Sequence, residues 1–291
     1  IIAENTFLMC DLKEFDICKN SQLKIIDRYA FNSSRLQILN IPSSIVDFKE
    51  YCFENLNFLN KINIIPYDQE NVRFVENSFL IGKSFVKNKD FDFLIYATRN
   101  IKNVVVVPDY IKHINKSAFR FCKNITKVEF SKNSQLETIG QSAFRETSIN
   151  EFTLPSHVSF LGDYAFMNCS ILNKFDFSNN NKLKVIPLCL FMRSGIELIE
   201  LPDQIEIINE KAFSDCSRLI TIKLPKNLKY IKTNAFDLSS VENLILPSSI
   251  ANFELKWCAS TKFLKNIQII NNVNTNIIYF DNKYILGKSD L

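Results

Sequence analysis

Cysteine and histidine are the side chains of this chain best suited to nucleophilic or metal chemistry, and it has eight Cys and two His. No C-x-x-C pair occurs, and potential metal ligands do not cluster. Four cysteines each follow a phenylalanine by three residues: Cys10, Cys122, Cys169 and Cys216. This spacing predicts a small inward-facing position, which suits a buried free thiol. An internal disulfide and structural zinc are the less favoured alternatives.

The remaining candidates for catalysis are also explained by position. His113 and His157 each follow a proline, where we expect an exposed turn. A Cys122–His113 pair could form a nucleophile and base, but Cys122 belongs to the regular cysteine positions. Acids such as Glu14 and Asp16 fall at expected solvent positions, and no Gly-rich phosphate loop occurs. The sequence predicts no enzyme, no metal and no cofactor.

The positions of these cysteines belong to a repeat that runs along most of the chain. An Ala-Phe pair, or a close variant of it, recurs every 22–25 residues, except for one gap of 66 residues between Phe53 and Phe119. Thr6-Phe7 is a degenerate first member. We call these phenylalanines the register phenylalanines: Phe7, Phe31, Phe53, Phe119, Phe144, Phe166, Phe191, Phe213 and Phe236. A fixed period of this length predicts a solenoid.

Residues 219–236 show the physical basis of the repeat. Ile222 and Leu224 alternate with a period of two, so both side chains face the same way from a short strand. Pro225 ends that strand because it has no N–H to donate. One repeat cannot bury its own apolar face, whereas stacked repeats cover one another. A helical array with a similar period is disfavoured, since the recurring proline would break helices.

The composition limits the classes of partner. With 35 basic and 31 acidic residues, the net charge of +4 suggests neither a nucleic-acid surface nor a polybasic membrane anchor. No apolar run approaches the ~18–20 residues of a spanning helix, so we expect no membrane insertion. The 26 phenylalanines predict a core filled by aromatic rings. The five glycines predict few left-handed turns.

The frame L-x-x-I-x-L-P-x-x-I-x-x-I-x-x-x-A-F-x-x-C resembles BspA-like leucine-rich repeats. Residues 212–236 show it nearly complete, and residues 118–144 show a longer variant. The predicted fold is a β-rich leucine-rich-repeat solenoid. We expect a right-handed coil of 22–25-residue repeats, a parallel sheet along one face, a β-hairpin excursion and little α-helix. The resemblance also implies a surface or secreted protein that adheres to host cells, matrix proteins or other microbes.

An irregular segment interrupts the repeats. Residues 62–84 and 267–289 are similar without a gap, and each has apolar clusters around an Asn-containing turn, which predicts a β-hairpin. We therefore expect repeat blocks at 1–65 and 97–270, an excursion at 66–96 and a truncated second excursion at 271–291. One continuous solenoid is favoured over two domains joined by a linker. We also expect a longer natural protein, with any signal and anchor outside this segment.

The outward strand positions are the predicted recognition surface, since they line a continuous sheet. For any single position, simple solvation is the more ordinary interpretation. Their mixed charges favour a protein ligand, such as a host-cell or extracellular-matrix protein, over a polyanion. We call the predicted set the strand ladder: Lys127, Glu129, Glu151, Thr153, Lys174, Asp176, Leu198, Glu200, Thr221, Lys223, Asn243 and Ile245.

Four sequons permit N-glycosylation in a eukaryotic secretory pathway: Asn32, Asn115, Asn124 and Asn168. The leading hypothesis is a non-enzymatic protein-binding ectodomain of a surface protein. A cytoplasmic scaffold that uses the same surface and a structural spacer are the alternatives.

Overall fold

A computed structural model describes residues 1–18, 20–65, 71–76, 78–85, 87–177 and 180–270, together with the backbone of two strands near the C-terminus. Every regular element in these residues is a β-strand, and none is a helix. The chain forms two compact units, residues 1–148 and residues 149–291.

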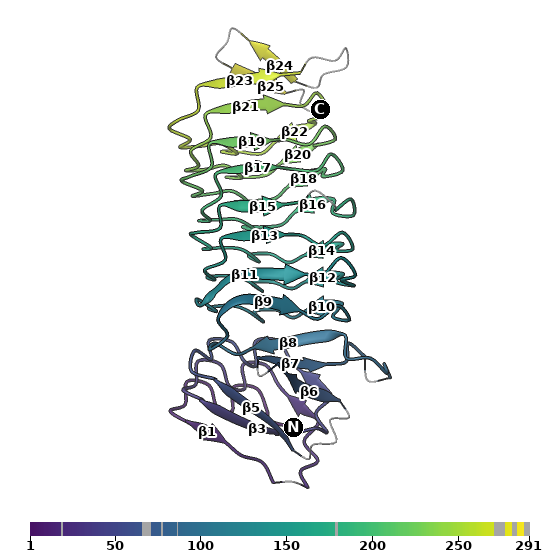
Figure 1. The fold of residues 1–291 in the computed structure, drawn as a ribbon. Helices are drawn as coiled ribbons and strands as arrows, with labels where there is room; N and C mark the ends of the chain where they lie inside the picture. The colour runs from purple at the N-terminus through teal and green to yellow at the C-terminus, as the bar shows by residue number, and fades with distance from the viewer. Residues whose placement is uncertain are drawn as a thin grey trace. The chain divides into compact units, whose positions relative to one another are not determined.

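The first unit begins as a β-solenoid whose short strands pair in parallel, because each coil returns the chain to the same direction (Figure 1). Leu39 lies opposite Ile62, and Ile41 lies opposite Ile64, so apolar side chains stack from one coil to the next. One sheet contains β1 (Glu14–Phe15), β3 (Ile38–Pro42) and β5 (Lys61–Ile65), and a second contains β2 (Ile25–Ile26) and β4 (Asp47–Phe48).

Antiparallel strands interrupt this solenoid, as the prediction of a β-hairpin excursion required. β6 (Val72–Val75) pairs antiparallel with β7 (Phe79–Gly82), and β7 pairs antiparallel with β8 (Phe93–Ala97). Parallel pairing then resumes in two sets. In the first, β10 (His113–Ile114) pairs with β8 and with β12 (Thr138–Ile139). In the second, β9 (Asn103–Val107) pairs with β11 (Ile125–Phe130). The predicted boundaries of the blocks stay a prediction.

The second unit has two parallel sheets (Figure 1). The longer contains β13 (Glu151–Thr153), β15 (Lys174–Asp176), β17 (Leu198–Glu200), β19 (Thr221–Lys223), β21 (Asn243–Leu246) and β23 (Asn266–Ile269). The shorter contains β16 (Val185–Ile186), β18 (Ile207–Ile208), β20 (Tyr230–Ile231) and β22 (Asn252–Phe253). β14 (Phe160–Leu161) precedes them.

Much of the predicted second excursion, residues 271–291, lies outside the described residues. Its described backbone forms an antiparallel pair, β24 (Ile277–Phe280) with β25 (Tyr284–Gly287).

The register phenylalanines form stacked columns inside each unit, which confirms the predicted role of the repeat. Phe213 is fully buried, with its ring centroid 5.5 Å from that of Phe191 and 5.4 Å from that of Phe236. In the first unit, the rings of Phe119 and Phe144 stack at 4.9 Å. Each ring therefore packs against its neighbours along the coil axis and loses contacts on both sides if it is removed.

The turns around the register phenylalanines contradict the expectation of few left-handed residues. Positive φ angles occur at 22 described non-glycine residues and at no described glycine. Twenty of the 22 form ten pairs, two residues before and two residues after each register position. Asn234 and Leu238, for example, flank Phe236. A tenth pair, Lys256 and Ser260, reveals a register position at Cys258 that the Ala-Phe pattern had missed.

Backbone hydrogen bonds between coils explain why these turns are left-handed. The amides of Cys189, Phe191 and Arg193 donate to carbonyl oxygens of the following coil, at N···O distances of 3.0, 2.9 and 3.0 Å. A left-handed residue costs roughly 1–2 kcal/mol, but here it rotates the peptide groups so that buried amides find partners. Hydrogen bonding between coils thus sustains a backbone that glycine usually provides.

The column of rings is interrupted inside the first unit between Phe53 and Phe119, at what we call the seam. Among the described residues, the amides of Tyr51, Phe53 and Asn55 have no acceptor in a following coil. Instead, the ring of Tyr96 meets that of Phe53 at 5.6 Å, and its hydroxyl donates to the Leu56 carbonyl at 2.9 Å. A residue of the excursion therefore replaces the missing ring.

Side-chain contacts across 66 residues of sequence also close the seam. Arg120 pairs with Glu54, with 13% and 14% of their side chains exposed, and Lys116 pairs with Glu50. The Lys116 hydrogen bond holds the pKa of Glu50 below its ordinary value, although burial acts in the opposite direction. Because the Arg120–Glu54 pair is largely sheltered from water, loss of one partner would be costly.

Removal of one ring from the column tests its contribution to stability. Phe213→Ala should lower the free energy of unfolding by about 3–5 kcal/mol, because it leaves a cavity between two stacked rings. The measurement is equilibrium denaturation. Phe160→Ala, at a ring that is 55% exposed, is the matched control and should change stability by no more than about 0.5 kcal/mol. Equal losses in the two variants would contradict the packed column.

The left-handed turns make a second prediction. Leu238 has a φ of 57° and an exposed side chain, so its backbone can be tested with little change in the core. Leu238→Val should destabilise the protein by about 1–2 kcal/mol, because a β-branched residue is least compatible with this φ. Leu238→Gly should cause no loss. The control is Ile220→Val, at a residue that is 52% exposed and has no positive φ. Thermal unfolding compares the three variants, and an unchanged stability of Leu238→Val would disprove the strain.

Candidate functional site

The strand ladder of the second unit points outward from the longer parallel sheet. Along β17 and β19 the order is exposed, buried, exposed, because alternate side chains of a strand face opposite sides. The other ladder residues of the second unit likewise lie on the outer face of the sheet. The inner face of the same strands carries a buried row: Phe152, Phe175, Ile199, Ile222 and Leu244. Exposed ladder residues are Thr153, Lys174, Leu198, Glu200, Thr221, Lys223, Asn243 and Ile245, and half-buried ones are Glu151 and Asp176.

Parallel register places ladder residues of successive strands directly opposite each other. Glu151 lies opposite Lys174, and Glu200 lies opposite Lys223. The hydrogen bond from Lys223 to Glu200 raises the pKa of the Lys223 ammonium group. At the usual strand spacing of about 4.8 Å, the ladder offers closely spaced charged, hydroxyl and apolar side chains. Such a surface is chemically suited to another protein's side chains.

The first unit holds the remaining ladder members, Lys127 and Glu129, on β11, with Lys127 Nζ 3.3 Å from Glu129 Oε1. Beside them lie Val104 and Val106 on β9, which are 50% and 54% exposed and which the repeat pattern did not indicate. The signal was present in the run Asn103-Val-Val-Val-Val-Pro108, which is apolar on both faces of a strand. These valines depart from the mostly polar outward positions of the other strands.

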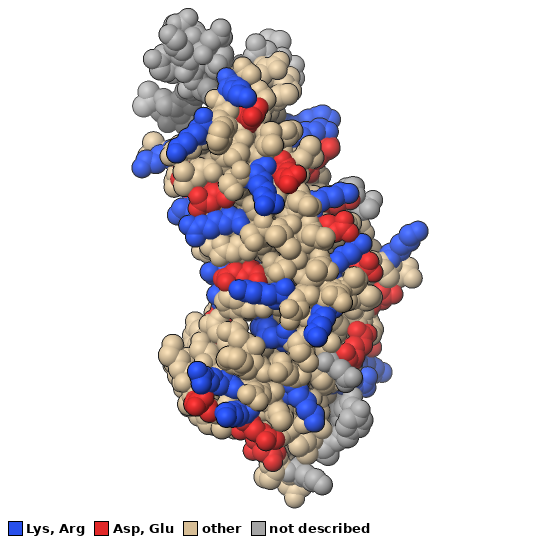
Figure 2. All heavy atoms as spheres, turned by 60° about the vertical axis from the view of Figure 1, so that its left-hand side comes forward, with Lys and Arg blue, Asp and Glu red and all other residues tan. Residues whose placement is uncertain are grey.

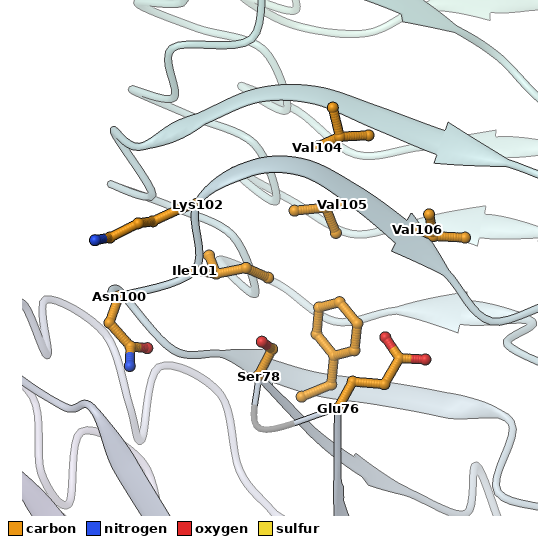
Figure 3. Close-up of a pocket in the computed structure, with 9 residues that line it drawn as sticks. Glu76, Ser78, Asn100, Ile101, Lys102, Val104, Val105 and Val106 are labelled. Carbon is orange, nitrogen blue, oxygen red and sulfur yellow. The ribbon is translucent and has the colours of Figure 1, made fainter.

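A hollow of about 300 Å³ adjoins β9. Figure 3 shows its lining: Glu76 and Ser78 come from the turn after β6, and Asn100 to Lys102 lead into β9. Lys102 lies to the left of Val105 and Val106 in Figure 3, and Glu76 lies below these two valines. The hollow thus combines an apolar wall with one cation and one carboxylate.

The surface charge is mixed. Figure 2 shows basic and acidic side chains interspersed over the visible face. Ion pairs also form between coils, such as Lys229 with Glu206 at 2.7 Å. This pattern favours specific polar contacts with a partner over a general electrostatic attraction to a partner of one charge sign.

The four sequons differ in accessibility. Asn124 is exposed at the start of β11, with Thr126 exposed beside it. Asn32 is buried, and its Nδ2 donates to Glu54 Oε2 at 3.2 Å. Asn115 and Asn168 are half-buried. A glycan at Asn32 would displace part of the turn, so Asn124 is the sequon most compatible with the fold.

The cysteines are free, and three of the four at regular positions are buried: Cys122, Cys169 and Cys216. This confirms the inward-facing position for those three, while Cys10 is half-buried. Burial raises the pKa of the Cys216 thiol to about 12. A thiol held neutral is a poor nucleophile, so these residues act as core side chains.

The histidines have ordinary surroundings. His157 is exposed in a turn, as predicted. The expectation of an exposed turn was wrong for His113, which is half-buried in β10 with Nδ1 3.0 Å from Thr138 Oγ1. His113 is half-buried because it pairs with strands on both sides, opposite Phe93 and Thr138. The Cys122 thiol instead lies 3.2 Å from Arg99 Nη1, and no group of three or more metal-ligating side chains occurs in the described part of the chain.

The family of this chain follows from the repeat geometry. A coil with two short parallel strands, one register ring and one buried, mostly Cys, Ser or Thr, position per turn is typical of a leucine-rich-repeat solenoid of the β-rich kind. The family model described as "BspA type Leucine rich repeat region (6 copies)" matches residues 1–88, 91–188 and 184–283. The chain belongs to this family.

Solved structures support the same fold. A leucine-rich repeat protein from Eubacterium ventriosum is 22% identical with a TM-score of 0.77, covering 97% of this chain and 72% of its own. One from Bacteroides ovatus is 22% identical with a TM-score of 0.52, covering 84% of this chain and 55% of its own. The pneumococcal vaccine antigen PcpA is 20% identical with a TM-score of 0.50, covering 91% and 73%. No curated protein matched the chain.

None of the described residues forms a helix long and apolar enough to cross a membrane.

The buried thiols predict alkaline destabilisation. Burial raises the pKa of Cys216, so the folded state keeps a proton that the unfolded state loses above about pH 8.5. The stabilisation is complete below that pH and decreases by about 1.4 kcal/mol per pH unit above it. Cys216→Ser, which copies Ser194 and Ser239 of other coils, should make this slope shallower by the contribution of one thiol, because other thiols with raised pKa values, such as Cys122, remain. Denaturation curves from pH 7 to about 11 measure it, and identical slopes would contradict the assignment.

Proposed function

We propose that this chain is a non-enzymatic protein-binding region of a cell-surface or secreted BspA-type protein, and that the strand ladder of the second unit contacts the ligand. The observation that carries the proposal is the regular outward alternation on β13 to β21, which presents ladder side chains from a hydrogen-bonded sheet. Side chains that are already arranged for binding lower its entropic cost.

The chemistry of the ladder favours a protein ligand. Lys174, Glu200 and Lys223 supply charged contacts, while Leu198 and Ile245 supply exposed apolar surface. Interfaces commonly combine apolar contacts with polar ones at the rim. A host-cell or extracellular-matrix protein fits this mixture, and the surface location rests on the family.

Replacement of three charged ladder residues tests the surface. Lys174→Ala, Glu200→Ala and Lys223→Ala together should weaken binding of the purified protein to epithelial cells and immobilised extracellular matrix by about tenfold or more, since charged anchors are lost. Flow cytometry and surface plasmon resonance measure the two interactions. Failure of the folded parent protein to bind either target would refute the adhesion proposal.

The second unit offers a matched control. Lys184→Ala, Glu206→Ala and Lys229→Ala remove the same charges beside the shorter sheet, where Lys229 Nζ is 2.7 Å and Lys184 Nζ 3.9 Å from Glu206 carboxylate oxygens. This variant should bind like the parent. Equal binding by parent, ladder variant and control would instead favour the structural spacer.

A further inference from the structure

The interruption of the solenoid leaves β9 at the edge of a sheet. Within the first unit, β9 pairs in parallel with β11, and β11 is its one strand partner among the described residues. An edge strand presents N–H and C=O groups that can pair with another extended chain. β9 is also five residues long, which is enough to align several such groups.

We propose that the free edge of β9 binds an extended segment of a protein partner, which pairs with β9 as an added parallel strand. This inference rests on the proposed protein-binding function and names a second contact for it. In strand addition, backbone hydrogen bonds supply affinity and pockets for side chains supply specificity. The hollow next to β9, about 300 Å³, provides such a pocket.

The side chains around the edge indicate the sequence of the segment. Val104 and Val106 are half-exposed and two residues apart on one face of β9. Apolar or β-branched residues of the partner would pack beside them as cross-strand pairs. Lys102 precedes β9, and Glu76 lies below Val105 and Val106 (Figure 3). A parallel segment therefore fits best with an acidic residue first, alternating apolar residues next and a basic residue last.

Charge supports this direction because neither Lys102 nor Glu76 has an ion pair with another described residue, whereas the ladder residues Lys127, Glu200 and Lys223 do. Both termini of the added strand would thus gain a charge partner, which no described residue provides for Lys102 or Glu76. Opposite-charge cross-strand contacts of this kind also set the register.

The test uses a peptide of sequence Glu-Val-Thr-Val-Thr-Val-Lys, blocked at both ends and carrying a fluorophore. Fluorescence anisotropy should show saturable binding to the whole chain at up to about 1 mM peptide, and amide hydrogen exchange should slow at β9. A peptide with proline in place of both threonines should not bind, because it cannot complete the ladder. Absence of binding by the first peptide would overturn the proposal.

Val106→Lys should weaken binding by about tenfold or more, since a lysine on an edge strand opposes pairing. Its matched control is Ile245→Lys on β21, because Ile245 is 51% exposed and Val106 54%, and this variant should bind normally. Val106→Thr keeps the β-branch and should retain binding. Lys102→Glu, at an exposed residue, should weaken binding even if Val106→Lys folds poorly. Equal effects of Val106→Lys and Ile245→Lys would refute the site.

Two further results separate this inference from others. The variant in which Lys174, Glu200 and Lys223 are replaced by alanine should bind the peptide normally. Failure of the proposed ladder surface can therefore be distinguished from failure of the proposed β9 site. Analytical ultracentrifugation tests whether a second copy of the chain occupies β9 instead. A dimer abolished by Val106→Lys would overturn the peptide assignment in favour of self-association.

Discussion

Packing of the register phenylalanine is the interaction on which the rest of the fold depends. Within each unit and away from the seam, the rings stack on their neighbours, as Phe213 does between Phe191 and Phe236. The same turns that enclose the rings carry left-handed residues on both sides, and those residues align amides with carbonyl oxygens of the next coil. Apolar burial and backbone hydrogen bonding are therefore satisfied by one geometry. The outward positions take no part in it, so they are available for the proposed recognition.

This division of labour explains how much could be predicted from the sequence. Period-two alternation around Ile222 and the spacing of the Ala-Phe pairs reflect inward contacts, so they predicted the solenoid and the outward direction of the ladder. The left-handed turns escaped prediction because glycine is the usual signal, and here hydrogen bonds between coils stabilise ordinary residues instead. The coil centred on Cys258 escaped for a related reason: backbone geometry defines it, while Trp257 and Cys258 replace Ala and Phe.

The seam could not be predicted in the same way, because its contacts do not repeat. The gap of 66 residues and the apolar clusters predicted a hairpin, but periodicity carries no information about which side chains close the break. Tyr96 supplies a ring, and the Arg120–Glu54 pair supplies charge, from segments far apart in sequence. Arg99 is buried there, with Nη1 donating to the Ala97 and Ala118 carbonyl oxygens and the guanidinium group 4.4 Å from the Tyr96 ring centroid.

The interruption also changes what the strands can do. In an unbroken stack, every strand of a parallel sheet has a neighbour on each side, and only its outward side chains are available to a partner. The hairpin strands β6 and β7 do not pair with β9, which has one strand partner among the described residues. The N–H and C=O groups on the other edge of β9 are therefore available to a partner as well. Edge strands are usually protected by charge or by a covering loop. On β9 the outward residues are instead valines beside a hollow whose lining includes Lys102 and Glu76. A surface that is unprotected in this way is better explained by a partner than by stability, because apolar exposure at an edge otherwise favours aggregation.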